Sequence, residues 1–354
     1  MGAKMKKLIL NRKINRSDLF FSCLILIALI LAGGNTANPD YNEYKYRYEN
    51  LINDVHTGTL RYAFQFIFNK VGFSYQLFRF TEFIFCFSLL SRIITRYTER
   101  RILVISLYFA YPFLLDAVQI GNCIAYSIIL YSIRYLDEEW PKGGIKYAIA
   151  VFIASQFHIS AIAYILFLLV YVKKTKYLIT YSILITLFFL NAINILPRYI
   201  NKIPIIRSHA IQIGYYLSYN QSYKNGAVTY AFLISVCFIL YYWKLSVVKK
   251  TNSELKGKIM SDTVTKILAL ELCFVPFILI NSEFVRLVRN MWILYYMAFV
   301  TDIKDNSGGI DKRDKCFKAI GIVLALFLYY KELSPSSYYY EIVTKAIINN
   351  NIFW

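Results

Sequence analysis

Polar side chains interrupt two of the apolar stretches in this sequence. Asp116, Gln119 and Asn122 lie in the otherwise apolar run 115–125, and His158 lies in a second apolar stretch. In a chain this apolar, polar side chains at lipid depth are costly and usually face a cavity or a partner. Carboxylate and imidazole groups can also accept a proton from a hydroxyl group. The two runs therefore indicate a catalytic or binding site.

Three residues are candidates for a general base. His158 belongs to the residue type that titrates near physiological pH, so its neutral imidazole could take a proton from a hydroxyl group. A lone histidine on an apolar face is more often a packing residue, and Ser160 offers it a local partner. Asp40 and Asp116 are alternative bases, because both fall on the outer side of the topology described below. The sequence leaves the choice open.

Arginine residues could hold a phosphate group. Arg286 and Arg289 are three residues apart, so they share one face of a helix. Guanidinium groups bind phosphate oxygens in bidentate geometry, so this pair could hold a diphosphate, or it could anchor the helix to lipid headgroups. Arg207 and His209 lie in a basic, tyrosine-containing segment that could contact phosphate and sugar, or could be an exposed loop without a specific ligand.

The composition is that of a membrane protein. The 354 residues are 58% hydrophobic and 17% charged, with a mean hydropathy of +0.45. The apolar stretches are too long and too many for a soluble core of this size, and their continuity favours helices over a barrel. We expect an all-α, polytopic membrane protein with a single transmembrane domain over residues 1–354. The net charge is +19, and the basic residues between the apolar spans would then orient the chain and meet anionic lipid, without a nucleic-acid partner.

The apolar runs predict about 11 transmembrane or re-entrant helices. They cover 19–33, 75–95, 102–115, 118–136, 147–157, 159–172, 177–196, 228–243, 262–280, 290–303 and 317–330. With the N-terminus in the cytoplasm, 25 Lys and Arg residues fall inside and 12 outside, which follows the positive-inside rule. Segments 34–74 and 197–227 are then extracytoplasmic, and residues 60–70 are expected to form an amphipathic helix on the membrane.

This topology depends on residues 147–172. A single tilted helix there would reverse every downstream loop, whereas two short limbs that turn near His158 preserve the charge rule. Limbs of 11 to 14 residues do not cross about 30 Å of hydrocarbon at about 1.5 Å per residue. We therefore expect the turn to be buried within the protein.

Glu82 is a carboxylate within an apolar run. An unpaired charge there costs about 2.5 to 3.5 kcal/mol on insertion scales. Arg79 precedes it by three residues and is its expected ion-pair partner.

Three short motifs resemble one family of membrane enzymes. They are Asp116–Ala125, Phe157–Ala161 and the two arginines in 286–290, in this order along the chain. The combination resembles the EpsG-like branch of the Wzy-type O-antigen and exopolysaccharide polymerases. That family often carries an acidic, tyrosine-containing stretch after its first helix, which Asp40 and Tyr44 match here.

The sequence departs from the family at one position. The family usually has arginine in the pattern Gln-Ile-Arg-Asn, where this chain has Gly121. The resemblance therefore implies that another arginine, such as Arg207 or Arg286, supplies this charge, or that diphosphate binding is weaker here.

The resemblance implies a metal-independent glycosyltransferase of the broad GT-C kind in the bacterial cytoplasmic (inner) membrane. It would transfer a growing glycan from undecaprenyl diphosphate to a lipid-linked repeat unit, with its active site facing the periplasm or the outside. His158, Asp40 and Asp116 would be the catalytic candidates. The residues expected to bind substrate are Arg286, Arg289, Arg207, His209, Gln119, Asn122 and Tyr44.

The expected partners follow from the same resemblance. They are an undecaprenyl-diphosphate-linked oligosaccharide, membrane lipid and a chain-length regulator protein. No histidine has another His or Cys at metal-ligand spacing, so we expect no metal and no other cofactor. Two other functions stay open at this point. A flippase of lipid-linked oligosaccharide would screen the same diphosphate in a basic cavity, and a membrane O-acyltransferase would use His158 as its base.

Overall fold

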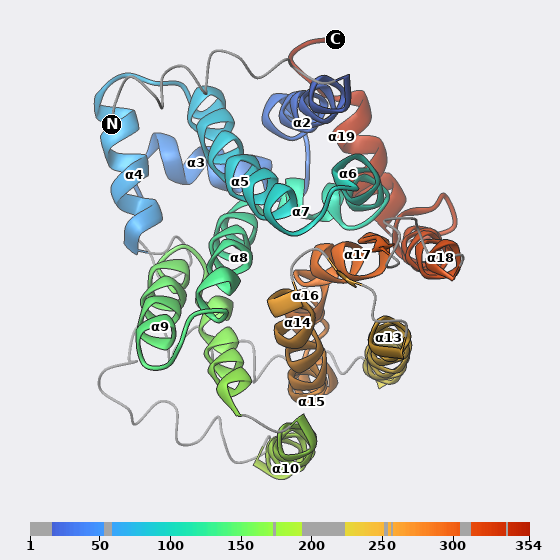
Figure 1. Ribbon diagram of the computed structural model, residues 1–354. Coiled ribbons are helices and arrows are strands. Elements are labelled where there is room, and N and C mark those ends of the chain that lie inside the picture. Colours follow the sequence, from blue (N-terminus) through green and yellow to red (C-terminus); the bar gives the residue numbers. More distant parts are fainter. Residues whose placement is uncertain are drawn as a thin grey trace, which may run out of the picture.

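The structure is built from helices (Figure 1). It is a computed structural model that describes residues 16–52, 59–172, 175–192, 224–250, 254–255, 258–304, 313–337 and 339–354. These residues form helices and their connections, one isolated β-bridge, and an antiparallel pair of two-residue strands, β1 (Glu254–Leu255) and β2 (Ile303–Lys304). The expected all-α class is confirmed.

The first half of the chain supplies the helices that carry Asp116 and His158. Its elements are α2 (Arg16–Gly34), α3 (Tyr41–Glu49), α4 (Thr59–Lys70), α5 (Tyr75–Tyr97), α6 (Arg101–Ala110), α7 (Phe113–Val118), α8 (Ile120–Ser132), η1 (Ile133–Tyr135) and α9 (Lys142–Ser155). Each apolar run expected between residues 19 and 157 falls on one to three of them. The residues expected as an amphipathic helix, 60–70, lie within α4.

The second half supplies the helices that carry the arginine pair. Its elements are η2 (Ile159–Tyr171), α10 (Thr175–Ala192), α13 (Lys224–Lys250), α14 (Lys258–Glu271), η4 (Leu272–Phe274), α15 (Val275–Ile280), η5 (Ser282–Phe284), α16 (Val285–Arg289), α17 (Trp292–Val300), α18 (Asp314–Leu333), η6 (Tyr340–Lys345) and α19 (Ala346–Asn349). The single helix expected over 262–280 is instead three pieces. A proline in the first turn of α15 explains the break, because proline cannot donate the backbone hydrogen bond that would continue the helix.

Residues 142–171 form two limbs that turn at His158. Trp140, just before α9, packs against Tyr171 at the end of η2 with ring centroids 5.5 Å apart. The expected two-limb arrangement is therefore confirmed. The second limb differs from expectation in one respect, because it is a 3₁₀ helix of 13 residues. At about 2.0 Å per residue it reaches about 26 Å, further than an α-helix of equal length.

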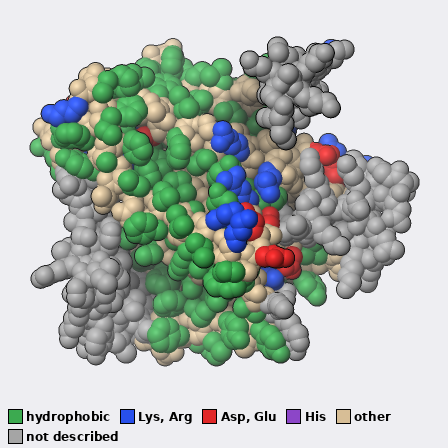
Figure 2. Space-filling view, turned by 60° about the vertical axis from the view of Figure 1, so that its left-hand side comes forward, with side chains coloured by type: hydrophobic (Ala, Val, Ile, Leu, Met, Phe, Trp, Pro, Cys, Tyr) green, Lys and Arg blue, Asp and Glu red, His purple; other side chains and the backbone are tan. Residues whose placement is uncertain are grey.

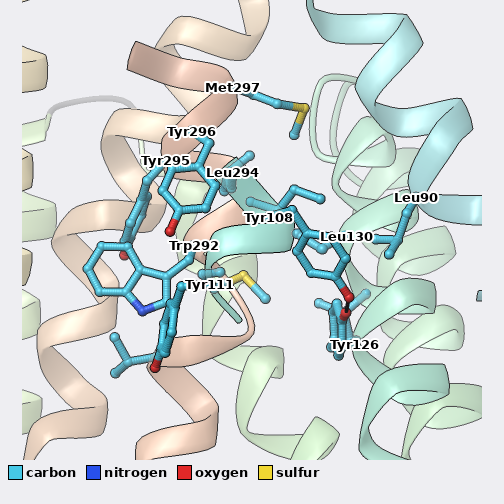
Figure 3. Close-up of a cluster of buried hydrophobic side chains, with 14 of the residues drawn as sticks. Leu90, Tyr108, Tyr111, Tyr126, Leu130, Trp292, Leu294, Tyr295, Tyr296 and Met297 are labelled. Carbon is cyan, nitrogen blue, oxygen red and sulfur yellow. Dashed lines mark hydrogen bonds between the residues drawn. The ribbon is translucent and has the colours of Figure 1, made fainter. Parts of the chain in front are cut away.

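The core is centred on α17. All nine of its residues are buried. Figure 3 shows Trp292, Tyr295 and Tyr296 of this helix packed together near Tyr111, and the rings of Trp292 and Tyr295 lie 4.9 Å apart. The helix begins three residues after α16 ends. It therefore holds the arginine pair of α16 against the centre of the molecule.

The surface of the molecule is largely apolar. Figure 2 shows hydrophobic side chains over much of one face, with a short row of Lys and Arg next to Asp and Glu. Helix α4 turns its polar side chains inward, because Arg61 and Gln65 are 2% and 1% exposed whereas Phe64 and Ile67 are 47% and 54% exposed. This is the reverse of a helix on a water-soluble protein.

Two helices in the described part of the chain are long and apolar enough to cross a membrane by length and hydropathy. They are Arg16–Gly34 and Asn225–Ser246. Shorter apolar helices cover Arg101–Ala110, Ile159–Tyr171 and Tyr177–Asn191.

Charged side chains gather at two opposite ends of the helices. At one end Arg100 donates to Asp302 over 2.9 Å, Lys318 pairs with the same carboxylate, and Asp18 pairs with Arg101. The other ends of α2, α5 and α18 carry the second set, described below. Helix α18 has 20 residues and is about 30 Å long, so its length separates the two sets by about the thickness of a hydrocarbon layer.

Candidate active site

A cavity of about 330 Å³ lies beside the short helix α16. Its volume is at the lower end of the range of about 300–1,000 Å³ typical of small-molecule sites. The polar residues around it come from distant parts of the sequence and include Gln119, Glu283, Arg286, Arg289, Lys331 and Glu332. The arginine pair therefore lines a cavity, as expected, and Gln119 joins it there.

Helix α16 is set by the turn before it. The side chain of Asn281 accepts a hydrogen bond of 2.9 Å from the backbone of Glu283, which starts the 3₁₀ turn η5. The helix then carries its two arginines three residues apart, and only 9% of Arg286 and 7% of Arg289 is exposed. Both guanidinium groups are therefore largely desolvated and held by the protein.

Arg289 is held by Gln119 and Asp116. It donates to the side-chain oxygen of Gln119, and its Nε lies 3.8 Å from Asp116. The other oxygen of Asp116 accepts from Tyr108 over 3.0 Å and from Tyr126 over 2.8 Å. Figure 3 shows these two tyrosines with their hydroxyl groups together. Asp116 is 1% exposed, so it is a buried counterion that positions Arg289.

Arg286 is held by Glu283 and His158. Its Nε donates to the carbonyl of Glu283 over 2.8 Å, and its guanidinium also pairs with the Glu283 carboxylate. Its Nη1 lies 3.2 Å from Nε2 of His158. Because a guanidinium can only donate, Nε2 must accept, and the imidazole is neutral with its proton on Nδ1. That proton is donated to the hydroxyl of Ser160 over 2.7 Å.

Asp40 and Tyr44 form the neighbouring part of the site. Asp40 precedes α3, and the Tyr44 ring lies under the guanidinium of Arg61 at 4.4 Å. Burial raises the pKa of the Asp40 carboxyl above its usual value, although Arg286 and Arg61 act in the opposite direction. Asp40 is therefore a half-buried carboxyl next to arginines, outside the predicted spans.

Asn122 joins helices within the described structure. It exchanges two amide hydrogen bonds with Asn290, of 3.0 and 3.2 Å, and Asn290 also donates to the hydroxyl of Tyr164. Asn122 is 1% exposed and is not among the residues that line the cavity. Arg207, His209 and most of segment 197–227 lie outside the described residues.

The expected pair between Glu82 and Arg79 is wrong. Glu82 is instead paired with Arg61 of α4 at 2.9 Å. Arg79 donates to the carbonyls of Ala32 and Ala117, at 3.1 and 2.7 Å. The spacing along one helix identified Arg79 as a neighbour of Glu82. The guanidinium of Arg79 instead satisfies two carbonyls near helix ends, which have no partner within their own helices.

A family model places the chain among known sequences. The model describes the EpsG family, and it matches residues 18–344. The chain belongs to the EpsG family. Membership points to a function of the polysaccharide-polymerase kind. Searches of curated proteins and of solved structures found no match.

The structure of this EpsG-family member shows which group lies beside Gly121. A Cβ atom added there would lie 3.5 Å from Nη1 of Arg61 and 3.4 Å from the carbonyl of Phe157. Arg61 therefore places a guanidinium where the resemblance led us to expect one from residue 121. Arg61 was missed in the sequence because it follows the first helix in an apparently amphipathic segment.

Two further cavity residues were missed in the sequence. Lys331 and Glu332 lie at the end of α18, where they read as an ordinary charged flank of an apolar helix. Their position at the predicted outer end of that helix was the available signal. The sequence held no indication that this end meets α16.

Proposed function

We propose that this protein is a bacterial polysaccharide polymerase of the cytoplasmic membrane. It transfers a growing glycan from undecaprenyl diphosphate to a lipid-linked repeat unit on the outer side of the membrane. The observation that supports this most is the cavity in which Arg286 and Arg289 meet Gln119 and the carboxylate of Glu332. It combines donors for a diphosphate with an acceptor for a hydroxyl proton.

The reaction places its largest electrostatic demand on the leaving group. As the bond between the sugar and the diphosphate breaks, negative charge grows on the diphosphate oxygens. Guanidinium groups held in fixed positions stabilise such charge without reorganising during the reaction. Arg286 and Arg289 are buried and tied to partners on other elements, which suits this role. The chemistry proposed here needs no metal, in keeping with a GT-C-like transferase.

The inverted helix surfaces support a membrane location. Apolar side chains of α4 face outward while its arginine and glutamine face inward, and α13 likewise buries Lys244 while Val228 and Phe232 are 69% and 65% exposed. Such an arrangement is costly in water and favourable in lipid. The two charged ends, about 30 Å apart along α18, would then lie at the two membrane surfaces.

The orientation follows from the positive residues. The end with Arg100, Arg101 and Lys318 corresponds to the side that the charge distribution places in the cytoplasm. The cavity at the opposite end would open outside. Cysteine labelling at Lys142 and at the exposed Tyr46 tests this, and we expect accessibility from opposite sides. Labelling of both positions from one side would contradict this orientation.

A flippase remains the principal alternative, and one experiment separates it from a polymerase. Purified protein is incubated in detergent with lipid-linked repeat units, and the products are separated on a gel. A ladder of longer lipid-linked glycans supports the polymerase. Transport across vesicles without any change of length contradicts it. Replacing both cavity arginines with alanine should abolish the ladder, whereas the matched control Lys345→Ala, at an exposed ion pair, should leave it intact.

The geometry gives an O-acyltransferase little support. Such an enzyme needs a free imidazole nitrogen as base. Both ring nitrogens of His158 are engaged, Nε2 by Arg286 and Nδ1 by Ser160.

A further inference from the structure

Resting on the proposed function, we infer that Glu332 is the general base that accepts the proton of the attacking sugar hydroxyl. Glu332 lies at the end of α18 and lines the same cavity as Arg286 and Arg289. Arg286 and Arg289 lie on α16 and Glu332 lies at the end of α18, so the cavity joins a carboxylate to two guanidinium groups only in the folded protein.

Glu332 has an orienting chain of hydroxyl groups behind it. Tyr230 donates to Oε1 of Glu332 over 2.7 Å, and the hydroxyl of Tyr111 lies 3.3 Å from that of Tyr230. Because the single proton of Tyr230 is given to the carboxylate, Tyr230 accepts from Tyr111. Both tyrosines are fully buried. They hold Oε1 in a fixed position.

The second oxygen of Glu332 is available to a substrate. In the described part of the chain the hydrogen bond to the Glu332 carboxylate is made to Oε1, and the nearest cation, Nζ of Lys331, is also closest to Oε1 at 3.9 Å. The side chain is 11% exposed and borders the cavity. Oε2 can therefore accept a hydroxyl proton without breaking the bond that orients the group.

The other acidic candidates are engaged elsewhere. The oxygens of Asp116 face Tyr108, Tyr126 and Arg289, and the carboxylate of Glu283 pairs with Arg286. Asp40 does not line this cavity. Asp40 is nevertheless a half-buried carboxyl near Arg286, and it is the competitor that an experiment must exclude.

The proposed step balances as follows. The oxygen of the acceptor hydroxyl forms a bond to the anomeric carbon of the donor, and its proton moves to Oε2 of Glu332. The bond from that carbon to the diphosphate oxygen breaks, and its electron pair leaves with the diphosphate. Arg286 and Arg289 stabilise the charge that develops on the leaving group.

The test compares purified Glu332→Gln with wild type in the elongation assay. General base assistance typically contributes about 100-fold to 10,000-fold in rate, so the variant should be slower by that factor. Its affinity for a fluorescent polyprenyl diphosphate should stay within about twofold of wild type. The decrease of rate at acidic pH should also disappear, because no carboxylate is left to protonate. Glu341→Gln is the matched control, since Glu341 is an exposed glutamate in the next segment.

Tyr230→Phe is expected to act as a positioning variant. It removes the hydrogen bond to Oε1 but keeps the base, so the rate should fall about tenfold while the pH dependence keeps its acidic decrease. If Glu332→Gln does not fold, Glu332→Asp decides the question. It keeps a carboxylate on a shorter stem and should be at least about tenfold slower than wild type, because positioning errors of about 1 Å are costly.

Several outcomes would overturn the assignment. The first is a wild-type rate for Glu332→Gln or Glu332→Asp. The second is a loss of polyprenyl diphosphate binding that accounts for the slower rate. The third is a decrease of the rate at acidic pH that is lost in Asp40→Asn but kept in Glu332→Gln. Elongation by wild type together with an active Glu332→Gln refutes the base alone. Wild type that does not lengthen the substrate refutes the proposed function, and the base with it.

Discussion

Replacement of His158 separates a positioning role from proton transfer. Its Nε2 accepts from Arg286 over 3.2 Å, and its Nδ1 donates to Ser160 over 2.7 Å. To act as a base, the imidazole would have to release Arg286 and acquire a positive charge beside that guanidinium. We therefore expect His158 to position Arg286 rather than to take the substrate proton.

The size of the effect follows from this bond. A hydrogen bond to a charged group contributes about 1.5–3 kcal/mol. At about 1.36 kcal/mol per tenfold change, its loss lowers the rate about 10-fold to 150-fold if the bond serves the transition state. His158→Ala should show this decrease. His158→Gln should stay within about tenfold of wild type, because its amide oxygen can accept from Arg286 although an amide is not a base.

The assay is the initial rate of elongation with purified lipid-linked units, measured from acidic to alkaline pH. Both variants should keep the pH dependence of wild type, since neither changes the base. Thermal unfolding in detergent serves as the control for folding. The reasoning is refuted if His158→Gln is as inactive as His158→Ala and the acidic decrease of the rate disappears in both.

Three further predictions concern the arginines and the charged end that contains Arg100 and Asp302. Arg286→Lys should slow elongation by at least about tenfold, because a lysine cannot reproduce the bidentate geometry, and an unchanged rate would remove Arg286 from diphosphate binding. Burial alone would raise the pKa of Asp302, but Arg100 and a lysine of α18 lower it below the usual value. Asp302 therefore stabilises the fold above about pH 4 and loses this effect as the pH falls, so Asp302→Asn should melt earlier at pH 7 and differ least at pH 3. Arg61→Ala should leave the buried carboxylate of Glu82 unpaired and lower the yield of folded protein. Adding Gly121→Arg should restore yield and activity, because residue 121 lies beside the Arg61 guanidinium. A double variant no better than Arg61→Ala would contradict this.

The helices could be predicted from the sequence because their apolar runs are long and continuous. Within the described residues each predicted run falls on helices, and the turn at His158 followed from the charge balance of the loops. The breaks within runs were harder to see, since one proline at the start of α15 divides a stretch that is apolar throughout. A hydropathy profile averages over neighbouring residues and misses such a break, whereas the backbone hydrogen bonds of the helix are interrupted at the proline.

The candidate site could be predicted only in part. Gln119 and the arginine pair stood out because they are polar residues beside apolar runs, and the structure brings them to one cavity. Pairing between helices could not be read in the same way. Glu82 had a plausible partner three residues away, yet it binds Arg61 of another helix. Such partners depend on how helices pack, which a single sequence does not specify.

The charge balance of the cavity favours a transferase over a flippase. Arg286 is paired with Glu283, Arg289 lies 3.8 Å from Asp116, and Lys331 is adjacent to a glutamate at 3.9 Å, so each cation already has an anionic neighbour. A diphosphate bound as proposed would compete with these carboxylates, which would limit how tightly the cavity holds the donor before reaction. The guanidinium groups interact more strongly as charge develops on the departing diphosphate. Interactions that strengthen in the transition state raise the rate, whereas uniform binding does not, and this is the balance that a transferase requires.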